Sequence, residues 1–379
     1  MTLNNWQKLT RILPGMPFGD AVDGDITISA DTTQSVSNKS CSGASGQKNL
    51  TIASADFSNG DIVLIHQSRG TGVGQWEINK VTSGGGSTTL VMQENLYYTY
   101  TDSGASQAQI YKIPRYKNIT INVSKTFLAP GWDQNIGGGL LFAGKQLTLT
   151  GLISAKDKGF LLGDGYTHTP ATGYQAEGTA NVKNLAQSTA KNGSGGGGGW
   201  TGETAASGGS GGHATAGTTG NNHGYGAVGG EGGDSAGTVD LINMVFGGGA
   251  GGFGACDGTS CGASTNGGGF VALFIQNIVV TGGIDVGSLT AGSGTHVSGS
   301  TGAAGSVLIV CQTATLGSNL ITAQPGTPGT AETSGVTGSV GRIAIHHSGV
   351  VTGLTSPTFT DVQDNSLVET GGAAILAVL

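Results

Sequence analysis

The chain has little charge and no concentration of basic residues. Only 10% of its 379 residues are Asp, Glu, Lys or Arg, against roughly a quarter in ordinary soluble domains. The formal net charge is −7. Nucleic-acid binding depends on clustered Lys and Arg, so nucleic acid is not expected as a partner. The charge is also too low for this length to keep the chain disordered.

Long apolar runs are absent as well. No stretch of about 18 apolar residues occurs, so no membrane-inserting segment is predicted. The opening MTLNNWQKLTRILPGMPFGD lacks a basic region followed by an apolar one and does not match a secretory signal. We therefore expect export by another route or release by lysis, and a location on a virion or at the extracellular cell surface.

Cysteine is rare. The chain contains four, at positions 41, 256, 261 and 311. Cys256 and Cys261 lie close together in a glycine-rich loop, a spacing that allows a local disulfide in an oxidising compartment, with free thiols as the alternative. A zinc site needs further Cys or His ligands at short spacing. None is adjacent, so neither a metal nor another cofactor is predicted.

Sequence patterns for catalysis are missing too. Glycoside hydrolysis needs two carboxylates at a fixed separation, which a β-solenoid would place at matched positions of neighbouring coils. The acidic residues are scattered, and no pair of them recurs at the spacing of the repeats. No G-x-S-x-G nucleophile elbow stands with a plausible base and acid. We therefore predict no catalytic residues and a protein that is not an enzyme.

Glycine is present in large excess. It contributes 73 of 379 residues, about 19%, where about 7% is usual. Many of these glycines fall in blocks, at 195–199, 208–212, 229–233, 247–252 and 267–269. Aromatic residues lie beside several of the blocks, which is not typical of a flexible Gly/Ser linker.

The glycine blocks are predicted to be ordered. Because glycine has no Cβ, extended polyproline-II-like chains can pack at the closest backbone spacing. Their N–H and C=O groups would then bond laterally to neighbouring chains. The Gly-X-Y period of collagen is absent, which excludes a triple helix. We expect an ordered polyglycine-II-type insert at about 160–266, with a disordered glycine-rich loop as the alternative.

The rest of the sequence predicts an all-β fold. Residues 23–136 contain short runs rich in Ile, Val, Thr and Tyr, typical of a β-rich domain built as a sandwich, barrel or solenoid. Residues 137–357 contain related units with two apolar strands each, which predicts stacked β coils, solenoid- or sandwich-like, around the insert. These units span 137–159, 267–294, 304–329 and 337–357. Residues 358–379 are expected to form a C-terminal β tail.

Residues 1–22 form a separate segment. Trp6, Leu9 and Leu13 fall on one face of a predicted short helix, which Pro14 ends. We expect this segment to attach the protein to a fibre protein or to other copies of itself. The alternative is that the helix packs against its own domain.

The sequence resembles the glycine-rich adhesins at the tips of tailed-phage fibres, and related glycine-rich surface proteins. The resemblance rests on the β-rich front, on blocks such as 195–199 and 247–252, and on the loops TGETAAS, ATAGTTGNNHGY and ACDGTSCGAS. The motif DGDITISADTT at 23–33 is also similar to openings of such proteins. The resemblance implies a sandwich of polyglycine helices that displays loops to a host surface glycan or outer-membrane protein.

Aromatic and histidine side chains in or beside these loops are the candidate receptor contacts. Aromatic rings can stack on sugars or pack on protein loops, and nearby Ser, Thr and Asn supply adaptable hydrogen bonds. The candidates are Trp200, Tyr225, His213, His223, Phe253, Tyr166 and Tyr174. Trp200 and Phe253 could instead cap the ends of the glycine core.

Two alternatives to an adhesin stay open at this stage. The first is a self-assembling subunit of an extracellular filament or surface layer, for which low charge would favour close contact between copies. The second is a polysaccharide-degrading enzyme built on a β-helix.

Overall fold

The protein is all-β in the part of the chain that the structure, a computed structural model, describes. The described residues are 18–166, 171–201, 205–222, 226–254 and 261–367. They contain no helix, which confirms the predicted all-β class, and none of them forms a helix able to cross a membrane. The helix predicted around Trp6, Leu9 and Leu13 lies outside these residues.

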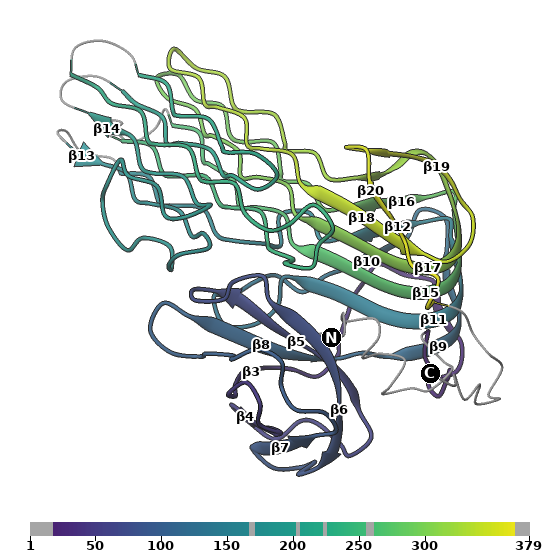
Figure 1. The fold of residues 1–379 in the computed structure, drawn as a ribbon. Helices are drawn as coiled ribbons and strands as arrows, with labels where there is room; N and C mark the ends of the chain where they lie inside the picture. The colour runs from purple at the N-terminus through teal and green to yellow at the C-terminus, as the bar shows by residue number, and fades with distance from the viewer. Residues whose placement is uncertain (1–17, 167–170, 202–204, 223–225, 255–260, 368–379) are drawn as a thin grey trace.

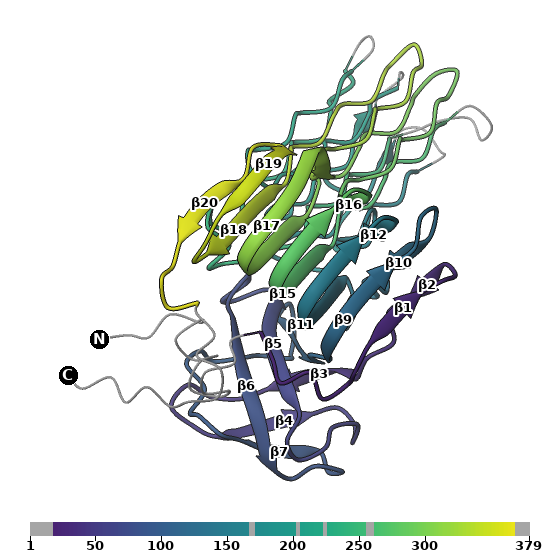
Figure 2. The same cartoon turned by 90° about the vertical axis from the view of Figure 1, so that its right-hand side faces the viewer.

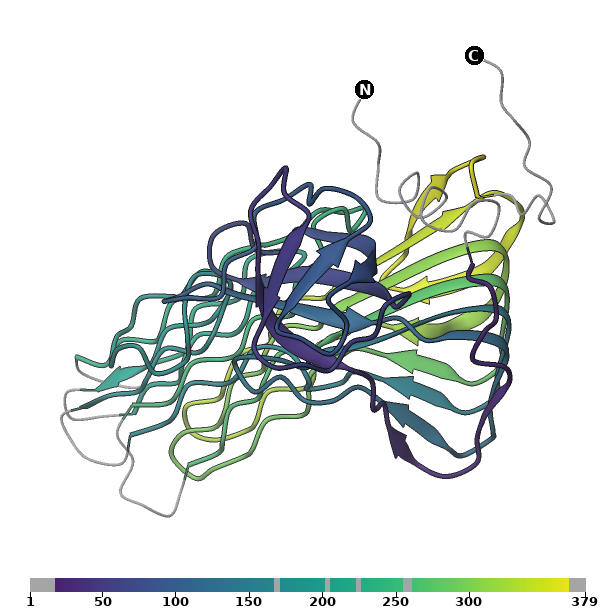
Figure 3. The same ribbon diagram turned by 90° about the horizontal axis from the view of Figure 1, so that it is seen from below.

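Three parts make up the fold: a stack of strand coils, a small barrel and a layer of extended chains (Figure 1). Figure 3 shows the barrel across the middle, with the extended chains on one side of it and the coils on the other. The predicted combination of solenoid-like coils with a further β-rich region is therefore confirmed.

The coils come from a 12-stranded parallel sheet that folds back on itself (Figure 2). Each coil is one strand, a corner and a second strand. The first strands are β1 (Ile26–Ile28), β9 (Arg115–Ile121), β11 (Gly139–Leu149), β15 (Phe270–Val280), the start of β17 (Ser306–Thr322) and β18 (Arg342–His347). The second strands are β2 (Thr32–Thr33), β10 (Thr126–Leu128), β12 (Leu152–Ser154), β16 (Gly283–Asp285), the end of β17 and β19 (Val351–Ser356). Strand β20 (Thr360–Gln363), in the predicted C-terminal tail, pairs with β18.

Alternation of apolar and polar residues determines which side of each strand faces the interior. Ile121 pairs with Ile28 on one side and with Leu149 on the other, and all three are buried in one core. The neighbouring row, which includes Thr120 and Thr148, points outward. Successive side chains of a strand point to opposite faces, so an alternating sequence such as NITI buries its isoleucines when the coils stack in register.

The barrel is inserted between the first two coils. Its strands are β3 (Asn38–Ser42), β4 (Asn49–Ile52), β5 (Ile62–Arg69), β6 (Trp76–Ser83), β7 (Thr89–Met92) and β8 (Gln107–Lys112), closed in the order β3-β4-β7-β6-β5-β8. Every residue of β5 is buried. Val63 and Ile65 face the barrel core, whereas Ile62 and Leu64 join a second core shared with the coils and the extended chains. This arrangement joins the barrel firmly to the rest of the protein.

The third part, the glycine layer, consists of the described residues within 155–269 together with 286–305 and 323–341. These segments leave the coils and run side by side as extended chains (Figures 1 and 2). Apart from the two-residue strands β13 (Ala171–Thr172) and β14 (Trp200–Thr201), their described residues form no strand. Backbone hydrogen bonds connect them laterally instead.

Hydrogen bonding within the layer repeats every third residue. The N–H of Gly196 donates to the carbonyl of Gly249 at 3.0 Å. Three residues later, the N–H of Gly199 donates to Gly252 of the same neighbouring chain at 2.9 Å. The two residues between them donate in other directions, Gly197 to Glu231 and Gly198 to Ser188. A helix with three residues per turn, as in polyproline II, presents every third residue to the same neighbour.

Close backbone contact explains why these positions are glycine. A Cβ on Gly197 would overlap the carbonyl oxygen of Thr189, and one on Gly198 would overlap that of Gly173. Both obstacles are backbone atoms and cannot rotate away. Any side chain at these interior positions would therefore force neighbouring chains apart.

In the last coils only one face of each extended chain lies this close to the backbone of the previous coil. Only every third residue there has to be glycine, so these segments contain fewer glycines. Strands β15, β17 and β18 follow one another at a 36-residue offset, since Ser306 pairs with Phe270 and with Arg342. The layer keeps this offset. Cβ atoms on residues 335, 338 and 341 would meet backbone at residues 299, 302 and 305. All six of these positions are glycine, and the positions between them hold Ser, Thr, Ala or Val.

The layer is anchored where its base meets the barrel and coils. Phe246 of the layer stacks on Phe270 of β15, with ring centroids 5.6 Å apart, and also packs against Trp132. The buried Arg69 of β5 forms an ion pair with the buried Glu177 of the layer. These contacts fix the direction in which the layer extends from the body.

Candidate functional site

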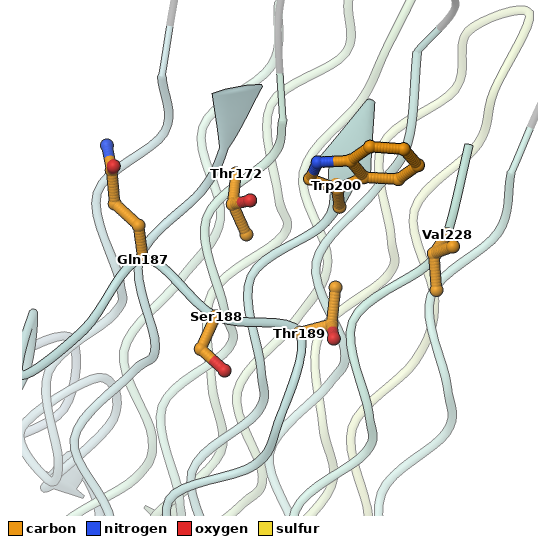
Figure 4. Close-up of a pocket in the computed structure, with 6 residues that line it drawn as sticks. All are labelled: Thr172, Gln187, Ser188, Thr189, Trp200 and Val228. Carbon is orange, nitrogen blue, oxygen red and sulfur yellow. The ribbon is translucent and has the colours of Figure 1, made fainter. Parts of the chain in front are cut away.

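A hollow opens beside Trp200, the residue that follows the glycine block 195–199 (Figure 4). It has a volume of about 300 Å³ and is open to solvent. Its lining consists of Thr172, Gln187, Ser188, Thr189, Trp200 and Val228. Trp200 was a predicted receptor contact, whereas the other lining residues were not.

Backbone pairing on both sides holds Trp200 in place. It pairs with Thr172 in the short antiparallel ladder of β13 and β14. On its other side, Trp200 and Val228 exchange two backbone hydrogen bonds of 2.8 and 2.9 Å. The indole is half-buried, and Val228 beside it is 47% exposed. The ring is therefore presented on fixed backbone rather than on a free loop.

The floor of the hollow is the chain Gln187–Ser188–Thr189, which Figure 4 shows running below the indole. The Ser188 carbonyl accepts a hydrogen bond from Gly198 at 2.7 Å, which ties this chain to the glycine block. Within the described residues, the side-chain amide of Gln187 and the hydroxyls of Thr172 and Thr189 form no hydrogen bonds. The hollow thus combines one aromatic face with uncommitted neutral polar groups and has no ionisable lining residue.

Three further candidates lie elsewhere in the layer. Phe253 is half-buried, and its ring covers Gly165, where a Cβ would overlap it. The neighbouring Tyr166 donates its N–H to the Phe253 carbonyl at 3.1 Å. Tyr174, also half-buried, accepts a backbone hydrogen bond from Gly252 at 3.0 Å. The structure thus brings Tyr166 and Phe253 together and places the Phe253 ring against Gly165.

The prediction for His213 is wrong. Its side chain is fully buried at the inner end of the layer, with Nε2 3.3 Å from the Ser306 hydroxyl of β17. Burial, aided by the charge of Arg342, lowers the pKa of His213 to about 3. The small residues around it suggested an exposed loop, but they instead form a tight turn against the coils. His213 therefore cannot contact a receptor.

The remaining predicted residues depend partly on segments outside the described chain. Tyr225, His223 and Cys256 lie there. Cys261 is disulfide-bonded, whereas Cys41 and Cys311 are free and buried. The Cys256–Cys261 pairing stays a prediction. Among the described residues, no group of three or more His, Cys, Asp or Glu side chains is placed to hold a metal ion.

Sequence reasoning missed most of the hollow because its lining comes from four separate stretches of chain. Thr172, Gln187–Thr189 and Val228 lie in polar, glycine-rich sequence like much else in the layer. Only the aromatic Trp200 carried a signal. The other lining residues become a group only when the glycine chains pack side by side.

No family model matches the chain, and no curated protein matches it. Among solved structures, the Gp54 tailspike of Acinetobacter baumannii bacteriophage AP22, in complex with A. baumannii capsular saccharide, aligns with 89% of this chain at 9% sequence identity. The alignment spans 58% of the tailspike chain with a TM-score of 0.20. A likeness at this level carries no argument about fold or function.

Proposed function

We propose that this protein is a receptor-binding adhesin of a virion or cell surface, without enzymatic activity. The observation that carries the proposal is the lateral hydrogen bonding of the glycine layer. It holds the Trp200 hollow in a fixed position, away from the barrel and coils. A host surface glycan or an outer-membrane protein is the proposed partner.

The layer acts, in this proposal, as a polyglycine-II-type sandwich. The three-residue recurrence of its hydrogen bonds supports this assignment, as does the close backbone approach at Gly197 and Gly198. Such packing leaves almost no side chains inside the layer. The layer therefore contributes stiffness, while the residues on its surface can differ in sequence without disturbing the packing. Preorganised contact surfaces lose less conformational entropy on binding.

Residues 1–22 provide the attachment in this proposal, either to a fibre protein or to other copies of the chain. Phe18 is the part of this segment that the structure places in a core, together with residues of β5 and β11. Deletion of residues 1–17 leaves that anchor intact. The shortened protein should fold and bind cells but should no longer assemble with the fibre protein or with other copies of the chain.

Adsorption to cells tests the adhesin proposal. Purified, fluorescently labelled protein is mixed with a panel of bacterial strains, and bound protein is measured after washing. We expect saturable binding to some strains only, with competition by unlabelled protein. Protein that binds no strain, or binds all strains without saturation, would contradict the proposal.

A filament or surface-layer subunit is the second candidate, and the open edges of the stack favour it. Within the described residues, β1 pairs only with β9, and β19 pairs only with β17. Unpaired strand edges can template pairing with another copy. Electron microscopy and sedimentation of the purified protein distinguish the two candidates, because a filament subunit should polymerise alone and an adhesin should remain discrete.

A polysaccharide-degrading enzyme is the third candidate, favoured by Asp157. Burial raises the pKa of this carboxyl to about 6. Its Oδ2 accepts a hydrogen bond from Asn266 at 3.1 Å, and its buried Oδ1 has no hydrogen-bond partner within the described residues. A raised pKa suits a general acid. Release of reducing ends from host polysaccharide, lost in Asp157→Asn, would establish this candidate in place of the non-enzymatic one.

A further inference from the structure

We propose that the Trp200 hollow binds one uncharged sugar ring, a hexose or N-acetylhexosamine unit, of a surface glycan. This inference rests on the proposed adhesin function and names the ligand class of one site within it.

The shape and chemistry of the hollow match a sugar. A pyranose ring has an apolar face of C–H groups and an edge of hydroxyls. The half-buried indole of Trp200, with the exposed Val228 beside it, offers an apolar surface for that face. The Gln187 amide and the hydroxyls of Thr172 and Thr189 lie around it and can donate and accept hydrogen bonds.

The size of the hollow also restricts its ligand. Its volume of about 300 Å³ lies at the lower end of the range for small-molecule sites. The open mouth lets a longer chain continue outward from the bound unit. A terminal or single internal sugar of a glycan therefore suits the hollow better than a folded protein loop, which would need a broad contact area.

Charge near the hollow selects against acidic sugars. None of the six lining residues is ionisable. Glu231 donates its backbone N–H to the Thr189 carbonyl at 2.8 Å, which brings an exposed carboxylate next to the floor. The nearby cation, Lys191, is paired with Asp234 at 2.6 Å. A uronic or sialic acid would be repelled by this carboxylate, and none of the six lining side chains is basic to compensate, whereas a neutral sugar would not be repelled.

Titration with defined saccharides tests the inference. The probes are cellobiose, maltose, lactose and N,N′-diacetylchitobiose, with the anionic 3′-sialyllactose and digalacturonic acid for comparison. Binding is followed by calorimetry and, in a Trp6→Phe background, by tryptophan fluorescence, since the other two tryptophans, Trp76 and Trp132, are buried and report little of a ligand at the surface. We expect at least one neutral probe to bind and to change the fluorescence, and the anionic probes to bind at least about tenfold more weakly.

Two variants locate the binding. Trp200→Ala should lower the affinity for the neutral probe by roughly tenfold or more, because it removes the stacking face. Trp200→Phe keeps a smaller ring and should retain part of the affinity, without the fluorescence change. Tyr97→Ala, which removes an exposed aromatic ring from the barrel, serves as the control and should bind like the wild type. Melting temperatures of all variants show whether the fold is retained.

The outcomes separate this inference from the adhesin proposal. If no neutral probe binds, if anionic probes bind as well as neutral ones, or if a folded Trp200→Ala binds unchanged, the hollow is not a neutral-sugar site. The adhesin proposal would still stand where wild type and Trp200→Ala adsorb equally to cells. If the wild type binds a neutral sugar but adsorbs to no strain, the sugar site stands and the adhesin proposal fails.

Discussion

Arg69 of the barrel and Glu177 of the glycine layer form an ion pair that is almost completely excluded from solvent, with side-chain exposures of 3% and 0%. Glu177 also accepts hydrogen bonds from Trp132 Nε1 at 2.9 Å and from the Leu161 N–H at 3.2 Å. Burial raises the pKa of Glu177, and these partners, Arg69 first, oppose the rise. One carboxylate thus connects the barrel, the connection before β11 and the base of the layer.

Removing one partner of this pair should destabilise the whole protein. Glu177→Gln would leave the Arg69 charge buried without its counter-ion, at a cost of about 3–5 kcal/mol. The free energy of unfolding from urea titration measures the loss. Asp164→Asn, in the exposed pair with Lys183, is the matched control and should cost at most about 1 kcal/mol. Equal effects of the two variants would contradict the anchoring role of Glu177.

A single methyl group inside the glycine layer should be costly. Gly197→Ala would place its Cβ against the Thr189 carbonyl oxygen, so chains must separate and lateral hydrogen bonds must break. We expect a loss of about 3 kcal/mol or more, measured by thermal unfolding. Gly131→Ala is the control, because its Cβ would meet only the Lys158 side chain at 4.0 Å. The control should be neutral or slightly stabilising, and a similar loss in both would refute close packing around Gly197.

Mild acid should destabilise the protein through two buried histidines. Burial lowers the pKa of His66 to about 4 and of His213 to about 3, from 6.5. Both are neutral when folded, so their stabilisation is present in full above pH 6.5. It is lost as pH falls from 6.5 towards the folded pKa values, because the unfolded chain binds protons first. At about 1.4 kcal/mol per pKa unit, the loss is on the order of 3 kcal/mol per histidine at pH 4.

The titration of Asp157 opposes the loss of stability that the histidines cause in mild acid. Its pKa is raised to about 6, so the folded state binds its proton first and gains stability as pH falls from about 6 to 4. The histidine contribution is isolated by comparing urea midpoints at pH 7.5 and 4.5 in wild type and His66→Gln. The variant should lose less stability between these two pH values. An unchanged difference would show that His66 does not titrate as the structure indicates.

The two free thiols should be unreactive in the folded protein. Cys41 and Cys311 are buried, and burial raises the pKa of Cys41 well above its usual value and that of Cys311 to about 12. Because the thiolate is the reactive form, a thiol reagent should modify neither residue under native conditions. Denaturation without a reductant should expose both. Rapid native modification of either cysteine, identified by mass spectrometry, would contradict their burial.

The sequence alone determined the all-β class and the local form of its strands. Alternation in NITI and in similar runs specified which side chains would be buried, because a strand turns successive residues to opposite faces. The glycine blocks likewise indicated close packing of extended chains, since only glycine leaves room for another backbone at positions such as Gly197. Both features follow from chain geometry and need no knowledge of distant contacts.

Only the tertiary structure decided how these pieces combine. The β-rich stretch of residues 23–136 gave no sign that β1 and β2 would join the coils while the barrel formed between them, because the strands on both sides look alike in composition. His213 looked exposed among small residues, yet the turn that carries it packs against Ser306. Trp200 meets Thr172 and Val228 only because glycine chains distant in sequence lie side by side. Long-range packing made these contacts, and glycine and serine, having so little side chain, cannot specify in the sequence which neighbours they meet.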